Sequence, residues 1–151
     1  MSYDIHLTDP VSGEVLHLPF SHTMHGGTYA AEYDPVSNKY HPMPIQDAWL
    51  NITYNYSKFY YEATDGDKDF YGKSFVEPGL QENLGIRGIY GKTGGDSIPM
   101  LERMIDRIKA KYPNPIYSDN YWDATSSNAL KPLYQLLEMA KLRPDGVWGG
   151  D

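Results

Sequence analysis

The sequence predicts an α+β fold in which an N-terminal antiparallel β-hairpin and sheet are packed by two C-terminal helices. Apolar and polar residues alternate in the first third of the chain, whereas helical periodicity is confined to the last third. Strands that come first and helices that come later are typical of the α+β class. The 151 residues fit a single domain, residues 1–151, because no repeat, low-complexity tract or linker divides them.

The first elements form a predicted β-hairpin. Residues 3–8 alternate between apolar and polar side chains, and residues 9–13 carry the Pro and Gly of a turn. Residues 14–18 are expected to return as the second strand, which Pro19 ends. A further short strand is expected at residues 28–33.

The middle of the chain predicts one aromatic strand and a short helix. Residues 34–44 contain three prolines and are expected to run over the surface. Residues 48–56 alternate as in a strand and residues 57–63 favour a helix, although a single helix through both segments is an open alternative. One face of the strand is apolar and aromatic, and the other is polar: Leu50, Ile52, Tyr54 and Tyr56 alternate with Asn51, Thr53 and Asn55.

Two amphipathic helices are predicted in the C-terminal part. In residues 98–112 apolar side chains recur on one face, and Asp96 or Ser97 is the expected cap. Residues 127–142 show the same periodicity, and Trp148 is expected to fold back onto the core. The predicted inward faces are Leu101, Met104, Ile105 and Ile108 in the first helix and Leu130, Leu133, Leu137 and Ala140 in the second.

A glycine-rich segment, residues 86–99, is the best candidate for a ligand site. It is expected to form a short strand, a loop and the start of a helix, where backbone N–H groups favour anions and glycines admit a ligand closely. The segment resembles a phosphate-binding P-loop but fails its pattern, because Ile86 stands where the first glycine is required. The alternative is a strand-to-helix turn with left-handed glycines, in which Asp96 caps the helix and repels an anion.

The expected ligand-binding residues come from this segment and from the aromatic strand. Arg87 is expected to pair with a phosphate, and Lys92 to add positive charge. Backbone groups of residues 93–97 are expected to donate hydrogen bonds, and tyrosine rings to stack against a base. The full set is Arg87, Tyr90, Lys92, Thr93, Gly94, Gly95, Ser97, Tyr54, Asn55 and Tyr56.

Composition excludes several classes of protein. The net charge of −7 argues against general binding to nucleic acid backbones. Without cysteine there is neither a disulfide framework nor a thiolate metal site. No apolar run is long enough to span a membrane, and no signal peptide is expected. Tyrosine is unusually frequent, with 14 residues, and is enriched at interfaces and ligand sites.

No metal, cofactor or catalytic set is predicted. His22 and His25 are three apart, but adjacent glycines disfavour the helix that would let both bind zinc. Residues 65–69 resemble the start of a calcium loop, which then has Phe70 and Val76 in place of the required Gly and Glu. No Ser lies in a nucleophile elbow, and no His is selected as a base. The sequence therefore favours a binding protein over an enzyme.

Several segments resemble a group of small proteins encoded by bacteriophages and prophages. The resemblance covers most of the chain, although residues 33–44 and 64–83 are longer than in the usual form. The matching segments are residues 3–5, 7–11, 13, 26–29, 49–57, 85–87, 89–94, 97–99 and 143–148. The resemblance implies a viral origin and action in the cytoplasm of a bacterial host. Such proteins often counter host defence, either by sequestering a nucleotide signal or by blocking a host protein.

Two hypotheses follow for the function. The first is a phage-encoded, non-catalytic protein that sequesters a small phosphate-bearing immune signal derived from a nucleotide. The alternative is an inhibitor or adaptor that binds a host bacterial protein through its tyrosine-rich loops, with its acidic charge steering it toward a basic partner. Neither hypothesis involves a membrane, and either is compatible with a homo-oligomer.

Overall fold

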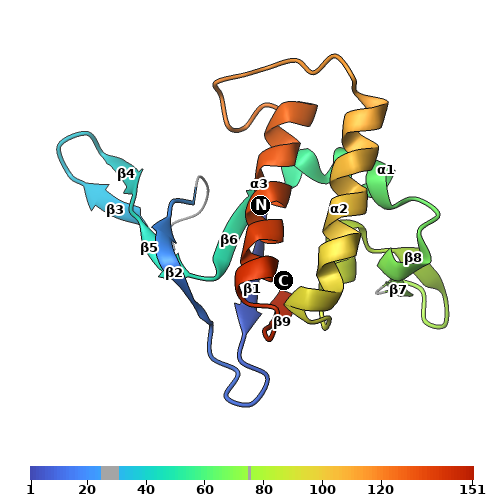
Figure 1. Ribbon diagram of the computed structural model, residues 1–151. Coiled ribbons are helices and arrows are strands. Elements are labelled where there is room, and N and C mark those ends of the chain that lie inside the picture. Colours follow the sequence, from blue (N-terminus) through green and yellow to red (C-terminus); the bar gives the residue numbers. More distant parts are fainter. Residues whose placement is uncertain (25–30, 75) are drawn as a thin grey trace.

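Two long helices, α2 (Gly94–Lys111) and α3 (Ser126–Leu142), lie side by side across one face of a three-stranded antiparallel sheet (Figure 1). This arrangement is seen in a computed structural model that describes residues 1–24, 31–74 and 76–151. It confirms the predicted α+β fold, with an N-terminal antiparallel sheet and two C-terminal helices packed against it.

Strand β1 (Ser2–Thr8) is the central strand of this sheet, between β6 (Trp49–Thr53) and β9 (Val147–Gly150). Both pairings are antiparallel. Because β9 pairs with β1, the first and last strands of the chain are neighbours in the sheet. Alternate side chains of β1 are buried, because successive residues of a strand point to opposite faces. The most deeply buried ones are Tyr3, Ile5 and Leu7.

Among the described residues, six further strands form three two-stranded sheets. In Figure 1 the hairpin of β3 and β4 projects from one side of the molecule, and that of β7 and β8 from the other. The pairs are β2 (His17–His22) with β5 (Ile45–Asp47), β3 (Ala31–Asp34) with β4 (Lys39–Pro42), and β7 (Tyr71–Lys73) with β8 (Gln81–Asn83). All of β4 is exposed, which agrees with the surface course expected for residues 34–44.

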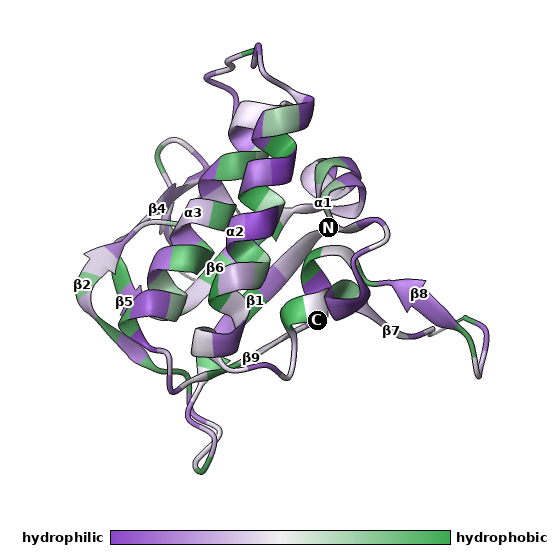
Figure 2. Cartoon of the chain, turned by 45° about the vertical axis from the view of Figure 1, so that its right-hand side comes forward, coloured by the Kyte–Doolittle hydropathy of each residue, from purple (hydrophilic) through white to green (hydrophobic). Residues whose placement is uncertain are grey.

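The core lies between the two long helices and the sheet. Each helix turns apolar residues inward every three or four positions, so hydrophilic and hydrophobic segments alternate along both helices in Figure 2. Trp148 of β9 is buried, as predicted. The predicted helix faces are confirmed: Leu101, Met104, Ile105, Ile108, Leu133, Leu137 and Ala140 are buried, and Leu130 is partly buried against the core.

The strand predicted over residues 48–56 ends earlier, at Thr53. The Thr53 hydroxyl accepts the N–H of Asn55 (3.2 Å), and this bond starts a 3-10 helix, η1 (Tyr54–Tyr56). Helix α1 (Ser57–Thr64) follows and confirms the predicted short helix. The alternative of one continuous helix is wrong, because the first part of this segment pairs with β1.

The polar face expected on this strand reaches solvent only at Asn55, which lies in η1. Asn51 and Thr53 are both buried. The Asn51 amide donates to Ser2 Oγ (2.8 Å) and to Asp4 Oδ1 (2.7 Å), both on the neighbouring β1. A buried amide needs such partners, so its role in the structure is to fix the pairing of β6 with β1.

The predicted N-terminal hairpin is confirmed at its tip and at the start of its return strand. Gly13 adopts a φ of 74°, and the Asp9 N–H donates to Glu14 O (2.8 Å). The predicted return beside β1 is confirmed at Val15 and Leu16, because Val15 pairs antiparallel with Thr8 and the Leu16 N–H donates to Leu7 O (2.9 Å). From His17 onward the prediction is wrong, since β2 continues through Pro19 and pairs with β5. The reason is that β6 pairs with residues 2–6 of β1, which leaves only the end of β1 for the returning chain.

Part of one predicted strand lies outside the described residues. Of residues 28–33, the last three belong to β3 and confirm the prediction there. His25, which was considered with His22 as a metal ligand, also lies outside the described residues. No helix in the described part of the chain is long and apolar enough to cross a membrane.

Candidate functional site

The segment expected to start as a strand at residue 86 forms a 3-10 helix, η3 (Gly85–Ile89). Two glycines account for this conformation. Gly85 adopts a left-handed φ of 59°, which favours glycine. A Cβ added at Gly88 would lie only 2.7 Å from Phe70 Cα, so η3 packs too closely for a side chain there.

Arg87 and Tyr90 lie three residues apart at the end of η3, where the Tyr90 N–H donates to Arg87 O (3.0 Å). Residues three apart are eclipsed in a 3-10 helix, so both side chains face the same cavity. The cavity, here called the Arg87 cavity, has a volume of about 700 Å³, which is typical of small-molecule sites. Its lining is Tyr61, Glu82, Asn83, Leu84, Arg87, Tyr90, Gly150 and Asp151.

The Arg87 guanidinium is fixed by aromatic rings and hydrogen bonds. Its carbon lies 4.6 Å from the ring centre of Tyr3 and 5.4 Å from that of Tyr54. Nη2 donates to the Tyr54 hydroxyl (2.7 Å), and Nε donates to Asp151 O (2.7 Å). Burial lowers the pKa of Arg87, but Tyr54, Tyr3 and Tyr90 outweigh this effect and raise the pKa above its ordinary value. The group therefore stays a cation.

The Arg87 cavity contains both donors and acceptors. A guanidinium has five N–H groups, and those of Arg87 beyond its two bonds have no acceptor in the described part of the chain. The Tyr90 hydroxyl donates to Asp151 O (3.3 Å), and burial raises the pKa of Tyr90, which keeps it protonated. Glu82 and Asp151 also line this cavity, and their carboxylates accept hydrogen bonds from Ser74 Oγ (3.2 Å) and from the Asp4 N–H (2.9 Å). The cavity therefore suits a ligand with one anionic group and further donors of its own.

Helix α2 begins at Gly94, and Thr93 is its cap. The Thr93 hydroxyl accepts the N–H of Asp96 (3.1 Å), so the expected cap at Asp96 or Ser97 is wrong. Gly94 and Gly95 are helical and neither has a positive φ, whereas Gly91 has a φ of 83°. The two glycines therefore do not extend the loop before the helix.

The first four N–H groups of α2 already have acceptors within the chain. The bonds run from Gly94 to Gly146 O (2.8 Å), from Gly95 to Pro144 O (3.1 Å), from Asp96 to Thr93 Oγ1 (3.1 Å) and from Ser97 to Thr93 O (3.1 Å). A helix start attracts anions through unpaired N–H groups. Of the donors expected to cradle a phosphate, two thus join α2 to the turn before β9, and two bond to Thr93, the cap of the helix.

Two other residues of the glycine-rich segment also contact β9. Ser97 is buried; its hydroxyl donates to Gly94 O (2.7 Å) and accepts the indole N–H of Trp148 (2.7 Å). Lys92 lies outside the lining of the Arg87 cavity, and its carbonyl accepts the N–H of Trp148 (2.9 Å). The backbone and side-chain bonds of this segment give it a structural role in holding β9 against α2.

The remaining candidates, Asn55 and Tyr56, face a different part of the molecule. Tyr56 is fully buried, and its hydroxyl donates to Tyr121 O. Burial raises the pKa of Tyr56 well above its ordinary value. The Asn55 amide donates to Trp122 O (2.8 Å). Both side chains anchor the segment between α2 and α3, and Tyr56 has no free ring face for a base.

The structure thus unites Arg87, Tyr90 and Tyr54, and it separates them from the other predicted residues. Sequence reasoning missed Tyr61 and the β8 residues that complete the cavity. The long insertion over residues 64–83 was a usable signal, because such loops are often functional. The sequence could not have predicted the contact of Tyr3 with Arg87, because a tyrosine on the buried face of a strand looks like any other core residue.

The described residues contain no group of three or more His, Asp or Glu side chains that could hold a metal ion. Comparisons of the chain with family models, curated proteins and solved structures gave no match. The resemblance to phage proteins therefore stays a prediction.

Proposed function

We propose that this protein is a non-catalytic binding protein that holds a small phosphate-bearing ligand in the Arg87 cavity. The observation that carries the proposal is a permanently charged guanidinium, fixed by Tyr3 and Tyr54, with unused donors on the wall of a cavity of about 700 Å³. A planar fork of this kind matches phosphate geometry and forms its strongest hydrogen bonds with anions.

Ring contacts supply the second part of the binding energy. Tyr61 and Tyr90 line the same cavity as Arg87. A nucleobase that stacks on a tyrosine ring gains about 1–3 kcal/mol, with little dependence on the base. A ligand that combines a phosphate with a base therefore uses both features of the cavity at once.

The two acidic residues of the cavity lining restrict the class of ligand further. Glu82 and Asp151 line the cavity beside its single cation, Arg87, so a polyphosphate would meet repulsion there. A phosphodiester carries one negative charge per phosphate, and its sugar or amino groups can donate to the carboxylates. Cyclic nucleotides are the class that fits this balance, and they agree with the nucleotide-derived immune signal expected from the phage resemblance.

Binding without turnover is proposed because of the side chains that line the cavity. None of the eight residues that line it, all in the described part of the chain, is a Ser, Thr, Cys or His. Nucleophilic catalysis depends on such groups or on a positioned carboxylate. The two carboxylates of the lining, Glu82 and Asp151, already accept hydrogen bonds from Ser74 Oγ (3.2 Å) and from the Asp4 N–H (2.9 Å). Sequestration in the cytoplasm of a bacterial host needs only affinity and abundance, which a small binding protein can supply.

Isothermal titration against cyclic and linear nucleotides tests the proposal. Cyclic nucleotides should bind more tightly than nucleoside triphosphates. Arg87→Lys keeps the positive charge but loses the planar guanidinium that can donate two hydrogen bonds to one phosphate. It should therefore weaken binding by about tenfold or more. Lys92→Gln is the matched control, because Lys92 lies outside the cavity lining. Absence of binding across the panel, or equal loss in both variants, would overturn the proposal.

The alternative of direct binding to a host protein is favoured by one other surface. The segment between α2 and α3 exposes Ile116 by 74 %, Tyr117 by 81 % and Trp122 by 52 %. Exposed aromatic residues of this kind are enriched at protein interfaces. Capture of one stoichiometric partner from bacterial lysate, lost in Tyr117→Ala but kept in Arg87→Lys, would support this alternative over ligand sequestration.

A further inference from the structure

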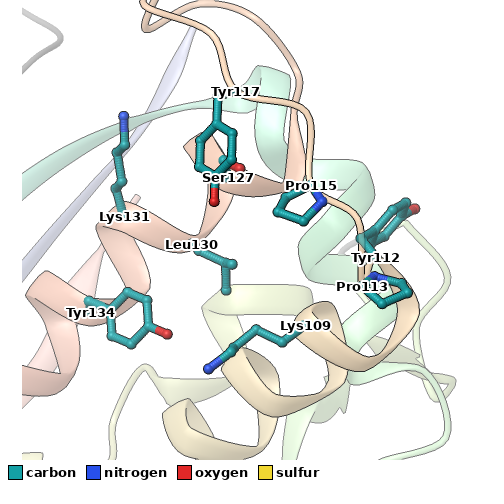
Figure 3. Close-up of a pocket in the computed structure, with 9 residues that line it drawn as sticks. All are labelled: Lys109, Tyr112, Pro113, Pro115, Tyr117, Ser127, Leu130, Lys131 and Tyr134. Atoms are coloured by element: carbon teal, nitrogen blue, oxygen red, sulfur yellow. The ribbon is translucent and has the colours of Figure 1, made fainter.

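A second cavity lies where α2 ends and α3 begins, beneath the segment that connects them (Figure 3). Its volume is about 320 Å³, which is at the small end of the range for ligand sites. The residues that line it come from both helices and from the connecting segment: Lys109, Tyr112, Pro113, Pro115, Tyr117, Ser127, Leu130, Lys131 and Tyr134. We propose that this cavity binds a small phosphorylated ligand with one aromatic ring, independently of the Arg87 cavity.

The charge of this cavity opposes that of the whole protein. Lys109 from the last turns of α2 and Lys131 from α3 both line it, whereas none of the residues lining it is acidic. The protein carries a net charge of −7, so a carboxylate-free site with two lysines is a local exception. Lys131 Nζ has only a long contact to Asn128 Oδ1 (3.4 Å), and a bound anion would give it a stronger partner.

Two carboxylates next to residues of this cavity have their own partners. Glu62 accepts the hydroxyl of Tyr112 (2.6 Å) and pairs with Lys111 (3.3 Å). Asp123, in the connecting segment, accepts from the Ser118 hydroxyl and lies outside the lining. Neither acid lines the cavity, and Asp119 lines a neighbouring cavity that also contains Lys131.

The start of α3 adds unused hydrogen-bond donors. Thr125 Oγ1 accepts the N–H of Asn128 (3.1 Å), but the N–H groups of Ser126 and Ser127 have no acceptor in the described part of the chain. The Ser127 hydroxyl also makes no hydrogen bond there, although this residue lines the cavity and is only 9 % exposed. The Ser127 oxygen is not among the fully buried atoms without a partner, so it is free to bind a ligand that enters the cavity. A phosphate oxygen would satisfy the hydroxyl and the N–H groups together, and the helix dipole favours its charge.

Tyrosine rings account for the aromatic part of the proposed ligand. Tyr112 is fixed, because its ring packs edge-on against Phe59 (5.2 Å between centres). Tyr117 and Tyr134 are both exposed, and they line the cavity together with Ser127 (Figure 3). A planar ring held against Tyr117 places an attached phosphate near the start of α3.

Nuclear magnetic resonance of ¹⁵N-labelled protein tests this inference, with inorganic phosphate and adenosine monophosphate as probes. Saturable shifts are expected at the amides of Ser126 and Ser127. The monophosphate should bind at least about fivefold more tightly than phosphate, because the base stacks. This preference should vanish in Tyr117→Ala, and Arg87→Lys should leave both affinities unchanged.

Variants of the cavity complete the test. Ser127→Ala should weaken phosphate binding by about tenfold, since a hydrogen bond to a charged group is lost. Lys131→Gln should weaken it by up to about fivefold. Lys141→Gln, the same charge change at the far end of α3, should have no effect. No saturable shift at Ser126 and Ser127, unchanged binding in Ser127→Ala, or equal loss in both lysine variants would refute the inference.

Discussion

Alanine substitutions at Gly94 and Gly95 should have opposite effects on stability, although the two residues are adjacent in the first turn of α2. A Cβ at Gly94 would lie 2.5 Å from O of Arg143, the residue after α3, and 3.2 Å from O of Ala140 in the last turn of α3. Neither carbonyl can rotate away as a side chain does, so α2 or the turn before β9 must shift. At Gly95 the nearest atoms are 3.5 Å away, in Pro144, which is ordinary contact.

The magnitudes follow from these distances. Overpacking costs about 1–3 kcal/mol, and we expect about 2 kcal/mol for Gly94→Ala because the clash is with backbone. For a chain of this size, this corresponds to a melting temperature lower by about 4–8 °C. Gly95→Ala should instead stabilise the protein by up to about 1 kcal/mol, since alanine favours the helix over glycine.

Thermal and urea denaturation of the two variants measure both effects. The urea dependence of the unfolding free energy should not change, because neither variant alters the surface exposed on unfolding. If Gly94→Ala melts like the wild type, or if Gly95→Ala loses as much stability, the close approach of α2 to the end of α3 does not explain the glycines. The ligand affinity of the Arg87 cavity should be unchanged in both, since neither residue lines it.

The helices were predictable because their signal is local. Leu101, Ile105 and Ile108 repeat at helical spacing, and only one face of the helix can be buried against a sheet. The start of α2 was not predictable to the residue. Thr93, Asp96 and Ser97 are all good caps, and the choice among them depends on where the turn before β9 meets the helix.

The Arg87 cavity could be predicted only in part, and the error has a geometric cause. A strand would place Arg87 and Tyr90 on opposite faces, because they are an odd number of residues apart. The 3-10 helix places them on the same side. Its formation depends on Gly88 packing against Phe70, a contact between distant positions that no local pattern reveals.

The glycine-rich segment shows how the same residues can serve ligand binding or packing. Gly94, Gly95 and Ser97 match what an anion site needs, yet the acceptors for their N–H groups come from the chain itself. The start of α3 differs from the start of α2. The sequence does not predict a site at Ser126 and Ser127, but their backbone N–H groups have no acceptor in the described part of the chain and lie at the end of α3 that borders a cavity. Only the tertiary position of the carbonyls distinguishes the two helix starts.

Two further predictions concern buried polar groups. Ser97→Ala removes the acceptor of the buried Trp148 indole, so the free energy of unfolding in urea should fall by about 1–3 kcal/mol. Ser127→Ala, which breaks no hydrogen bond, should change it by less than about 0.5 kcal/mol. The last prediction concerns Asp67, which is 10 % exposed and accepts from Arg103 (2.9 Å). Burial acts to raise the pKa of Asp67. The hydrogen bonds from Arg103 and Arg107 outweigh burial and lower this pKa below its ordinary value. A carboxylate with a depressed pKa stabilises the fold above its unfolded value of about 3.9, and this contribution disappears as the pH falls through the folded value. Asp67→Asn should therefore unfold more easily than the wild type by about 1–3 kcal/mol at neutral pH, and this difference should shrink as the pH is lowered below about 4. Urea denaturation of both proteins across this pH range measures it, and a difference that stays constant with pH would show that the ionised carboxylate of Asp67 is not what holds its loop to α2.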